Sequence, residues 1–277
     1  MRAAALGYGT KLECVRCFVF PAFRSPETMT DTWIFPDWPA PSRVHAAITT
    51  RHGPGISAPP FERFNLGLRS GDMADAVATN RSALQQALAL PATPRWLRQV
   101  HGISVAELGP LPSPDEPQAD AAVSHIPGTV LSILTADCLP VLFCADDGSE
   151  IGAAHAGWRG LAAGVLEATL TQLHAPRERL LAWLGPCIGV APYEVGEEVR
   201  AAFVTIDMAS TDCFVPTRPA HWRCDLAELA RRRLAAAGVT RIYGGGFDTF
   251  SDARFYSYRR DGARSGRFAS LIWLAES

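Results

Sequence analysis

The chain has 277 residues, of which 48% are hydrophobic and 19% are charged. This is the composition of a globular protein with a sizeable core, so a disordered or fibrous chain is excluded. Lys and Arg number 26 and Asp and Glu number 28, for a formal net charge of -2, which gives no electrostatic reason to expect nucleic acid or an anionic membrane as partner.

The first 28 residues lack the helical and strand periodicity seen later in the chain, and Met29 opens a coherent segment. No internal repeat or low-complexity linker divides the part that follows. We therefore expect residues 1–28 to be an unstructured or non-native leader and residues 29–277 to form a single catalytic domain.

The first half of the domain alternates strand-like and helical segments. A helix is predicted from Ala74 to Leu90, with Asp72 as its N-cap. Segments of apolar and β-branched residues predict strands at Val44–Thr50, Pro94–Val100 and Ile103–Leu108.

The second half continues this mixture. Helices are predicted from apolar residues at helical spacing, at Leu161–His174, Glu197–Phe203 and Leu226–Ala237. Strands are predicted at Leu131–Ala136, Leu139–Ala145, Ile151–His155, Leu180–Leu184, Arg241–Tyr243, Phe255–Tyr258 and Phe268–Leu274. The pattern predicts one domain of mixed α and β structure.

Neither a membrane span nor a secretory signal is predicted. The longest apolar runs fall far short of the roughly 20 residues that a membrane helix needs, and polar residues interrupt any signal-peptide core near the start. The seven cysteines are odd in number and mostly lie in apolar stretches, which is typical of reduced thiols. We expect a cytoplasmic protein.

A hairpin signal brings two chemically interesting residues together. The pair Asp147-Gly148 favours a two-residue turn, and with that turn Pro140 faces His155 across the hairpin. Cys138 is then the diagonal neighbour of His155 on the same face, within roughly 7 to 8 Å between backbones. This places the cysteine and the histidine within reach of a shared metal ion or of one another.

His101 is a third candidate, because it lies where the backbone bends at Gly102 between two strand-like segments. Two imidazoles and one thiolate are a suitable ligand set for zinc with water in the fourth position. They also resemble blue-copper ligation, and Cys138 with either histidine could instead form a nucleophile and base dyad. A multinuclear copper cluster is disfavoured, because the chain has only seven histidines and no His-x-His pair.

The segment after His155 predicts an anion site. It reads His155-Ala156-Gly157-Trp158-Arg159-Gly160 and leads from a strand into a helix, where free backbone N–H groups and Arg159 favour negative charge.

Seven short motifs in order resemble a known bacterial family, once called multicopper polyphenol oxidases or laccase-domain proteins and later described as purine nucleoside phosphorylases with adenosine deaminase activity. The motifs are Thr49-Thr50-Arg51, Phe64-Asn65-Leu66-Gly67, Gln99-Val100-His101-Gly102, Thr135-Ala136-Asp137-Cys138-Leu139-Pro140, the run from His155 to Gly160, Gly185-Pro186-Cys187-Ile188 and Tyr258-Arg259-Arg260-Asp261-Gly262.

The resemblance implies a zinc site made of His101, Cys138 and His155, the same set that the ligand chemistry and the hairpin register indicate. It implies an α+β fold with mixed sheets sandwiched between helical layers (α/β/β/α), similar to deamidating toxins that use a Cys-His dyad. The implied activity is zinc-dependent phosphorolysis of adenosine, inosine and methylthioadenosine, together with adenosine deamination.

In this hypothesis the partners are a nucleoside and phosphate, and zinc activates water for attack on C6 of adenine. Arg51, Asn65 and Arg159 are assigned to substrate or phosphate binding. Cys138 and Asp137 are the catalytic candidates. Asp137 either donates a proton to the departing base or only orients its neighbours.

Two alternatives stay open at this stage. One is a copper-dependent polyphenol oxidase, for which the His2Cys set and the older family name are the reasons. The other is a non-catalytic metal- or ligand-binding module. The sequence leaves both a monomer and a homodimer possible.

Overall fold

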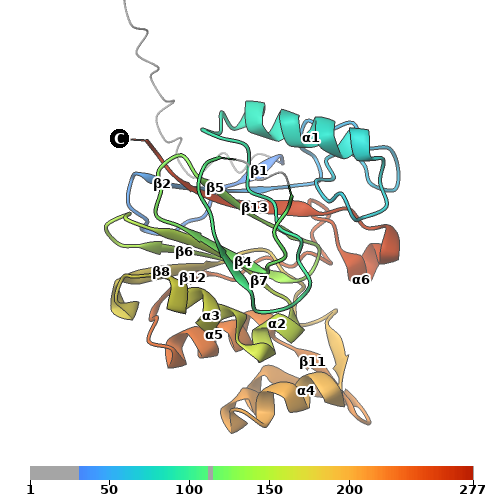
Figure 1. Ribbon diagram of the computed structural model, residues 1–277. Coiled ribbons are helices and arrows are strands. Elements are labelled where there is room, and N and C mark those ends of the chain that lie inside the picture. The colour runs from blue at the N-terminus through green and yellow to red at the C-terminus, as the bar shows by residue number, and fades with distance from the viewer. Residues whose placement is uncertain (1–30, 112–114, 277) are drawn as a thin grey trace, which may run out of the picture.

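The computed structural model of the chain describes residues 31–111 and 115–276, so the leader predicted over 1–28 lies outside the described residues. The fold is α+β and is built in four layers: helix α1, a first sheet, a second sheet and a layer of helices α2, α3 and α5 (Figure 1). This confirms the predicted α/β/β/α arrangement.

The two large sheets lie face to face. In the four-stranded sheet the order is β1 (Trp33–Ile34), β2 (Val44–Thr49), β13 (Phe268–Leu274), β5 (Val130–Thr135), and all neighbours are antiparallel. In the six-stranded sheet the order is β12 (Arg241–Gly244), β8 (Leu180–Leu184), β6 (Leu139–Ala145), β7 (Ile151–Ala156), β4 (Ala121–Ser124), β3 (Val105–Glu107). Only the two edge pairs of this second sheet are parallel.

The helices cover the outer faces of these sheets. They are α1 (Ala74–Ala87) over the first sheet, and α2 (Trp158–Ala163), α3 (Val165–Gln172) and α5 (Leu226–Ala236) over the second. A small third sheet of β10 (Phe214–Arg218), β11 (His221–Cys224) and β9 (Glu194–Gly196) adjoins α4 (Glu197–Val204), and α6 (Tyr258–Asp261) precedes β13. None of the described helices combines the length and apolarity that crossing a membrane requires.

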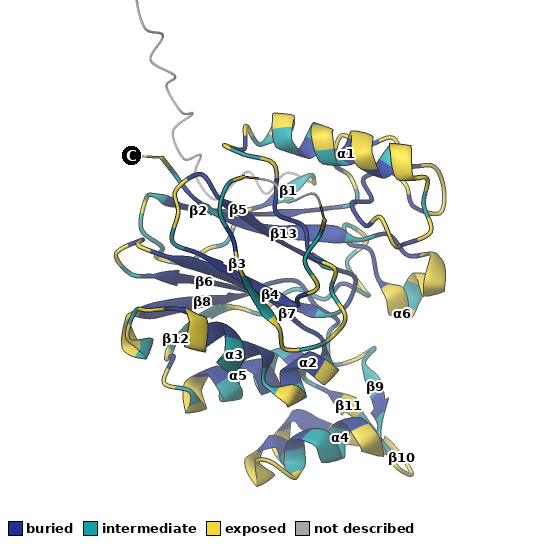
Figure 2. Ribbon diagram, in the orientation of Figure 1, coloured by how far each residue is buried: buried dark blue, intermediate teal, exposed yellow. Residues whose placement is uncertain are grey.

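Both large sheets are buried on their two faces (Figure 2), and this explains why their strands are apolar throughout. Along β6, Val141 and Phe143 point to the core under the helices, whereas Leu142 and Cys144 point to the core between the sheets. All seven β6 residues are buried. Because successive side chains in a strand face opposite sides, a strand between two apolar layers must be apolar throughout.

The helix predicted over 161–174 is in fact two helices. It begins earlier, at Trp158, and Gly164 interrupts it with φ of 103°. Glycine adopts this left-handed conformation without the steric penalty of a side chain. The break leaves α2 with six residues, so the helix-dipole part of the predicted anion site is weak.

Two predicted strands are absent, and in both cases side-chain bonds replace a ladder. In the segment 94–100, Arg95 alone forms a bridge, to Leu131, while the Gln99 side chain bonds both the N–H (2.9 Å) and the C=O (2.8 Å) of Leu134. In the segment 255–258, Tyr256 is a buried anchor whose hydroxyl donates to the Phe61 carbonyl at 2.7 Å. In these two segments the apolar pattern indicates burial of the side chains, and it does not indicate pairing in a sheet.

The predicted N-cap of α1 is wrong by one residue. Met73 occupies that position without a side-chain bond to the helix. The Asp72 carboxylate instead accepts hydrogen bonds from Ser57 (2.6 Å) and Asn65 (3.0 Å). The strands β1, β4, β9, β10 and β11, each of at most five residues, were not predicted.

Candidate metal centre and cavity

The hairpin register predicted from the sequence is confirmed, and it brings the three predicted ligands together. Pro140 pairs with His155 across β6 and β7. Cys138 lies two residues before Pro140, and its Sγ is 3.7 Å from Nε2 of His101. The His101 and His155 rings are 4.7 Å apart between centroids, and one ligand atom from each of the three residues lies within 4.8 Å of the others.

The donor set fits a zinc ion. Tetrahedral coordination with Zn–S near 2.3 Å and Zn–N near 2.05 Å places sulfur and nitrogen roughly 3.6 Å apart. The Cys138–His101 separation of 3.7 Å matches this value. With three protein ligands, the fourth position would be left to a substrate or water molecule, which is typical of catalytic zinc sites.

Asp120 holds both histidines in place, and the sequence analysis missed it. Its Oδ1 contacts Nδ1 of His155 at 2.9 Å and accepts from the backbone N–H of His101 at 2.8 Å, while Oδ2 accepts from Gly102 at 2.7 Å. A bond at Nδ1 directs Nε2 of His155 toward Cys138, which fixes the tautomer that a metal requires. Burial alone would raise the pKa of the Asp120 carboxyl, but its bonds to His155 and Gly102 lower it.

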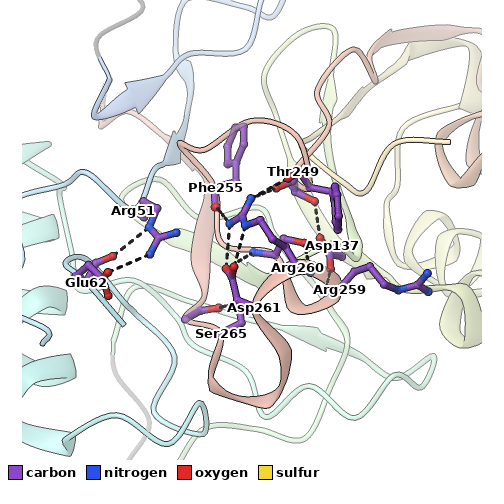
Figure 3. Close-up of polar contacts among 12 residues, drawn as sticks. Arg51, Glu62, Asp137, Thr249, Phe255, Arg259, Arg260, Asp261 and Ser265 are labelled. Atoms are coloured by element: carbon purple, nitrogen blue, oxygen red, sulfur yellow. Dashed lines mark hydrogen bonds and ion pairs between the residues drawn. The ribbon is translucent and has the colours of Figure 1, made fainter. Parts of the chain in front are cut away.

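Asp137 shapes the loop that carries Cys138. Its backbone has φ of 87°, a left-handed conformation that is unusual for a residue with a side chain. Its carboxylate accepts from the Thr249 hydroxyl at 2.6 Å and from the Arg259 N–H at 2.7 Å (Figure 3). A carboxylate that accepts two such bonds is suited to orienting the loop.

Gly157 allows the chain to pass close to the ligands. A Cβ at this position would lie 2.9 Å from Sγ of Cys138 and 3.0 Å from Cδ2 of His101. The backbone of Gly157 has φ of -62° and ψ of 157°, which any residue adopts without strain. Space, and not conformation, therefore explains the glycine here.

We expect Gly157→Ala to weaken zinc binding at least about 10-fold while the fold remains, because the added methyl displaces the thiolate and one imidazole from ligand distance. Competition with a chromophoric chelator measures the affinity. Gly246→Ala is the matched control, since no atom lies within 4 Å of a Cβ built there. Equal affinities in the two variants would contradict the steric argument.

Without metal, the centre is a thiolate beside an imidazolium. Burial opposes ionisation of the thiol, but His155 and His101 outweigh this effect and lower the pKa of Cys138 to about 6. Burial likewise opposes the charge on His155, but Cys138 and Asp120 raise the pKa of this imidazole to about 9. Between about pH 6 and pH 9, the Cys138 thiolate and the His155 imidazolium are therefore both charged.

Alkylation of Cys138 in chelator-treated protein is therefore expected to rise between pH 5 and 7 and to level off above about pH 7, because the thiolate form is complete there. An ordinary thiol would continue to gain reactivity up to about pH 9. Mass spectrometry of the peptide that contains Cys138 measures the rate. His155→Gln should move the midpoint upward, and an unchanged midpoint near 9 in the unmutated protein would contradict the assignment.

The ligands open into a cavity of about 950 Å³. Arginines and aromatic side chains line it, among them Arg69, Trp158, Arg159, Tyr193, Tyr258, Arg259 and Arg267. Arg159 is exposed, and its guanidinium lies 4.4 Å from the Trp158 ring centroid. The lining therefore combines positive charge with flat apolar surfaces, next to the candidate metal ligands His101, Cys138 and His155.

The structure does not bring Arg51 and Asn65 to this cavity. Arg51 instead bonds the Glu62 carbonyl at 3.1 Å and lies 3.9 Å from its carboxylate (Figure 3). Asn65 is fully buried, and its Oδ1 accepts from the N–H of Arg267 at 2.8 Å. Asn65 thus contacts the backbone of a cavity arginine and does not itself face the cavity.

Arg267 and Tyr193 line the cavity but are not among the predicted site residues; the arginine was interpreted as part of a solvated turn. Arg267 follows Ser265-Gly266 at the entrance to β13 and packs against Gly67, where a Cβ would lie 2.7 Å from its side chain. Tyr193 lies in a short turn before β9. Asp120 left a better signal, because a lone acidic residue directly precedes the buried run Ala121–Ser124.

Comparison with known proteins places these features in one family. The family model described as "Multi-copper polyphenol oxidoreductase laccase" matches residues 45–275. A purine nucleoside phosphorylase of Pseudomonas aeruginosa is 52% identical over 248 residues, covering 89% of this chain and 100% of the relative. One of Escherichia coli is 48% identical over 242 residues, covering 87% and 98%.

Solved structures of similar proteins share the fold of this chain. A Neisseria meningitidis protein superposes with a TM-score of 0.83 at 42% identity, covering 88% of this chain and 100% of that one. YlmD of Geobacillus stearothermophilus gives a TM-score of 0.78 at 30% identity, covering 85% and 93%. The chain therefore belongs to the multi-copper polyphenol oxidoreductase laccase family.

Proposed function

We propose that the chain is a zinc-dependent purine nucleoside phosphorylase that also deaminates adenosine. The observation that carries this proposal is the convergence of His101, Cys138 and His155 within 4.8 Å at the wall of the arginine-lined cavity. The names of the relatives in Pseudomonas aeruginosa and Escherichia coli support the phosphorylase part. The proposed catalytic domain is the segment 29–277, acting in the cytoplasm.

Phosphorolysis needs a site for phosphate next to the ribose. Attack of a phosphate oxygen on C1′ breaks the C–N glycosidic bond and yields ribose 1-phosphate and the free base. Arg159 and Arg267 line the same cavity as the three candidate metal ligands. Burial lowers the pKa of Arg267 from its usual value, so its guanidinium is poorly hydrated and gains from pairing with an anion.

Purine binding needs flat apolar surfaces, which Trp158 and Tyr258 supply in the same cavity. A zinc ion held by these residues would act as a Lewis acid and would lower the pKa of a bound water molecule. Cys138, His101 and His155 would hold it, and Asp120 fixes the orientation of His155. In deamination, water replaces the 6-amino group of adenosine, giving inosine and ammonia.

Asp137 is the residue that the sequence offers as proton donor to the departing base. Asp137 has both carboxylate oxygens engaged, by Thr249 and by the Arg259 N–H, which supports a positioning role. Asp137 lines the cavity, but because both of its carboxylate oxygens are engaged, we assign it to positioning the loop, and another cavity residue then delivers the proton.

Arg159→Ala is expected to lower kcat/KM for phosphate by roughly 10- to 100-fold, because a charge-assisted hydrogen bond contributes about 1.5 to 3 kcal/mol. Deamination uses water and should change much less. Both rates are measured on one preparation. Arg179→Ala is the matched control, since this exposed arginine bonds Asp146 and Asp147 at the β6–β7 turn. Equal losses in both activities would remove Arg159 from the phosphate site.

A further inference from the structure

A second group of metal-ligating side chains lies at the opposite end of β7. The strands β4 and β7 are antiparallel, and their last paired residues are Ser124 and Ile151. One step further out, His125 and Glu150 face each other, with Nδ1 of His125 3.1 Å from Oε2 of Glu150. His174, which follows α3, stacks on His125 with 4.3 Å between ring centroids.

The distance along the strand separates this group from the first one. Glu150 precedes β7 and His155 lies near its other end, which corresponds to roughly 16 Å at about 3.3 Å per residue. One ligand atom from each of His125, Glu150 and His174 lies within 4.8 Å of the others. None of the three lines the cavity described above.

Glu150 is a buried carboxylate in need of a counter-charge. Its side chain is 2% exposed, and among the described residues its one ion-pair partner is His125, which is charged only when protonated. Its oxygens accept from the N–H groups of His174 (2.9 Å) and Ala175 (2.7 Å). These bonds orient the carboxylate toward the histidines but supply no full positive charge, so a bound cation would offset the cost of burial.

The ligand set matches one that zinc uses, two imidazoles and one carboxylate. Tetrahedral geometry places a nitrogen and an oxygen ligand roughly 3.4 Å apart, close to the 3.1 Å between His125 and Glu150. The two rings are nearly parallel, at 9°, and imidazole binds metal in its own plane. The exposed His174 must therefore rotate to direct a nitrogen toward the shared point.

We propose that His125, Glu150 and His174 form a second divalent-cation site that accepts zinc. The site links the loop after α3 to the ends of β4 and β7. It is independent of the cavity and of the proposed enzymatic activity.

Zinc per chain, measured by elemental analysis at one buffered free-zinc concentration, tests the proposal on four proteins and one control. We expect two zinc ions in the unmutated chain, one in Cys138→Ala, one in His174→Ala and none in the double variant. His52→Ala, at another exposed histidine, is the matched control and should retain two. His174→Ala is chosen because the side chain is exposed, so the fold should survive.

The outcomes separate the two sites. If His174→Ala leaves the zinc content unchanged in both backgrounds, the second site is refuted. If Cys138→Ala leaves the zinc content unchanged while His174→Ala removes one zinc ion, the second site is supported and the first is refuted.

Thermal unfolding provides a second readout. In the Cys138→Ala background, saturating zinc should raise the Tm by roughly 5 °C through mass action. His125→Ala in that background should abolish the shift. A shift that persists without His125 would also refute the site.

Discussion

Cys138→Ala is expected to remove one stoichiometric zinc ion and to reduce phosphorolysis and deamination at least about 100-fold, while the Tm of the metal-free protein changes little. The thiolate of Cys138 is the strongest of the three donors for zinc. Cys138 lies in the connection between β5 and β6, at the wall of the cavity. An open catalytic site contributes less to folding than a closed structural one. Elemental analysis and a coupled assay for base release measure the two effects.

Cys144→Ala is the control for this prediction. Cys144 lies in β6, is fully buried in the core between the sheets, and is free. Burial raises the pKa of its thiol to about 12, so it supplies no thiolate at neutral pH. Its variant should lose some stability and keep its zinc and activity, whereas full activity in Cys138→Ala would exclude the thiolate from catalysis.

The second large effect is expected from Asp120→Asn. The carboxylate accepts from His155, His101, Gly102 and Val100, and an amide would present its NH2 group to one of these donors. We expect about 3 kcal/mol lower stability and a 10- to 100-fold loss of zinc affinity and activity. Chemical denaturation and chelator competition measure these quantities.

The two readouts separate positioning from a purely structural role. Asp252→Asn is the control, because Asp252 bonds the N–H and guanidinium of Arg254 and no histidine. It should lose stability without losing zinc affinity. If Asp120→Asn lowers stability alone, Asp120 does not orient the ligands.

How far sequence could predict this site depends on the range of the interactions. The register that pairs Pro140 with His155 depends on a local turn, so the sequence near Asp147-Gly148 could predict it. The turn itself differs from the prediction, because the N–H of Gly148 bonds the carbonyl of Ala145 and places Asp146 and Asp147 at its centre. His101 lies far from both in sequence, and its approach to Cys138 is fixed by Asp120 and by Gln99 bonded to Leu134. Such long-range side-chain bonds leave no periodic signal.

The phosphate-binding prediction shows the same limit. Asn65 lies in a motif shared with the family, and the role of a substrate ligand was assigned from that resemblance. In the fold its amide is buried and positions the backbone of Arg267. A motif shows that a residue matters, but only the fold separates the residue that faces the cavity from the one that supports it.

The central claim is tested most directly by identifying the products of metal-quantified protein incubated with adenosine, with and without phosphate. We expect free base and ribose 1-phosphate only when phosphate is present, with hypoxanthine as well as adenine because inosine is also a substrate. We expect ammonia from deamination in both cases, and neither reaction once a chelator has removed the zinc. Oxidation of a phenol by the copper-loaded protein at comparable rates, with adenosine left intact, would contradict it. So would a protein that retains its zinc and converts no nucleoside.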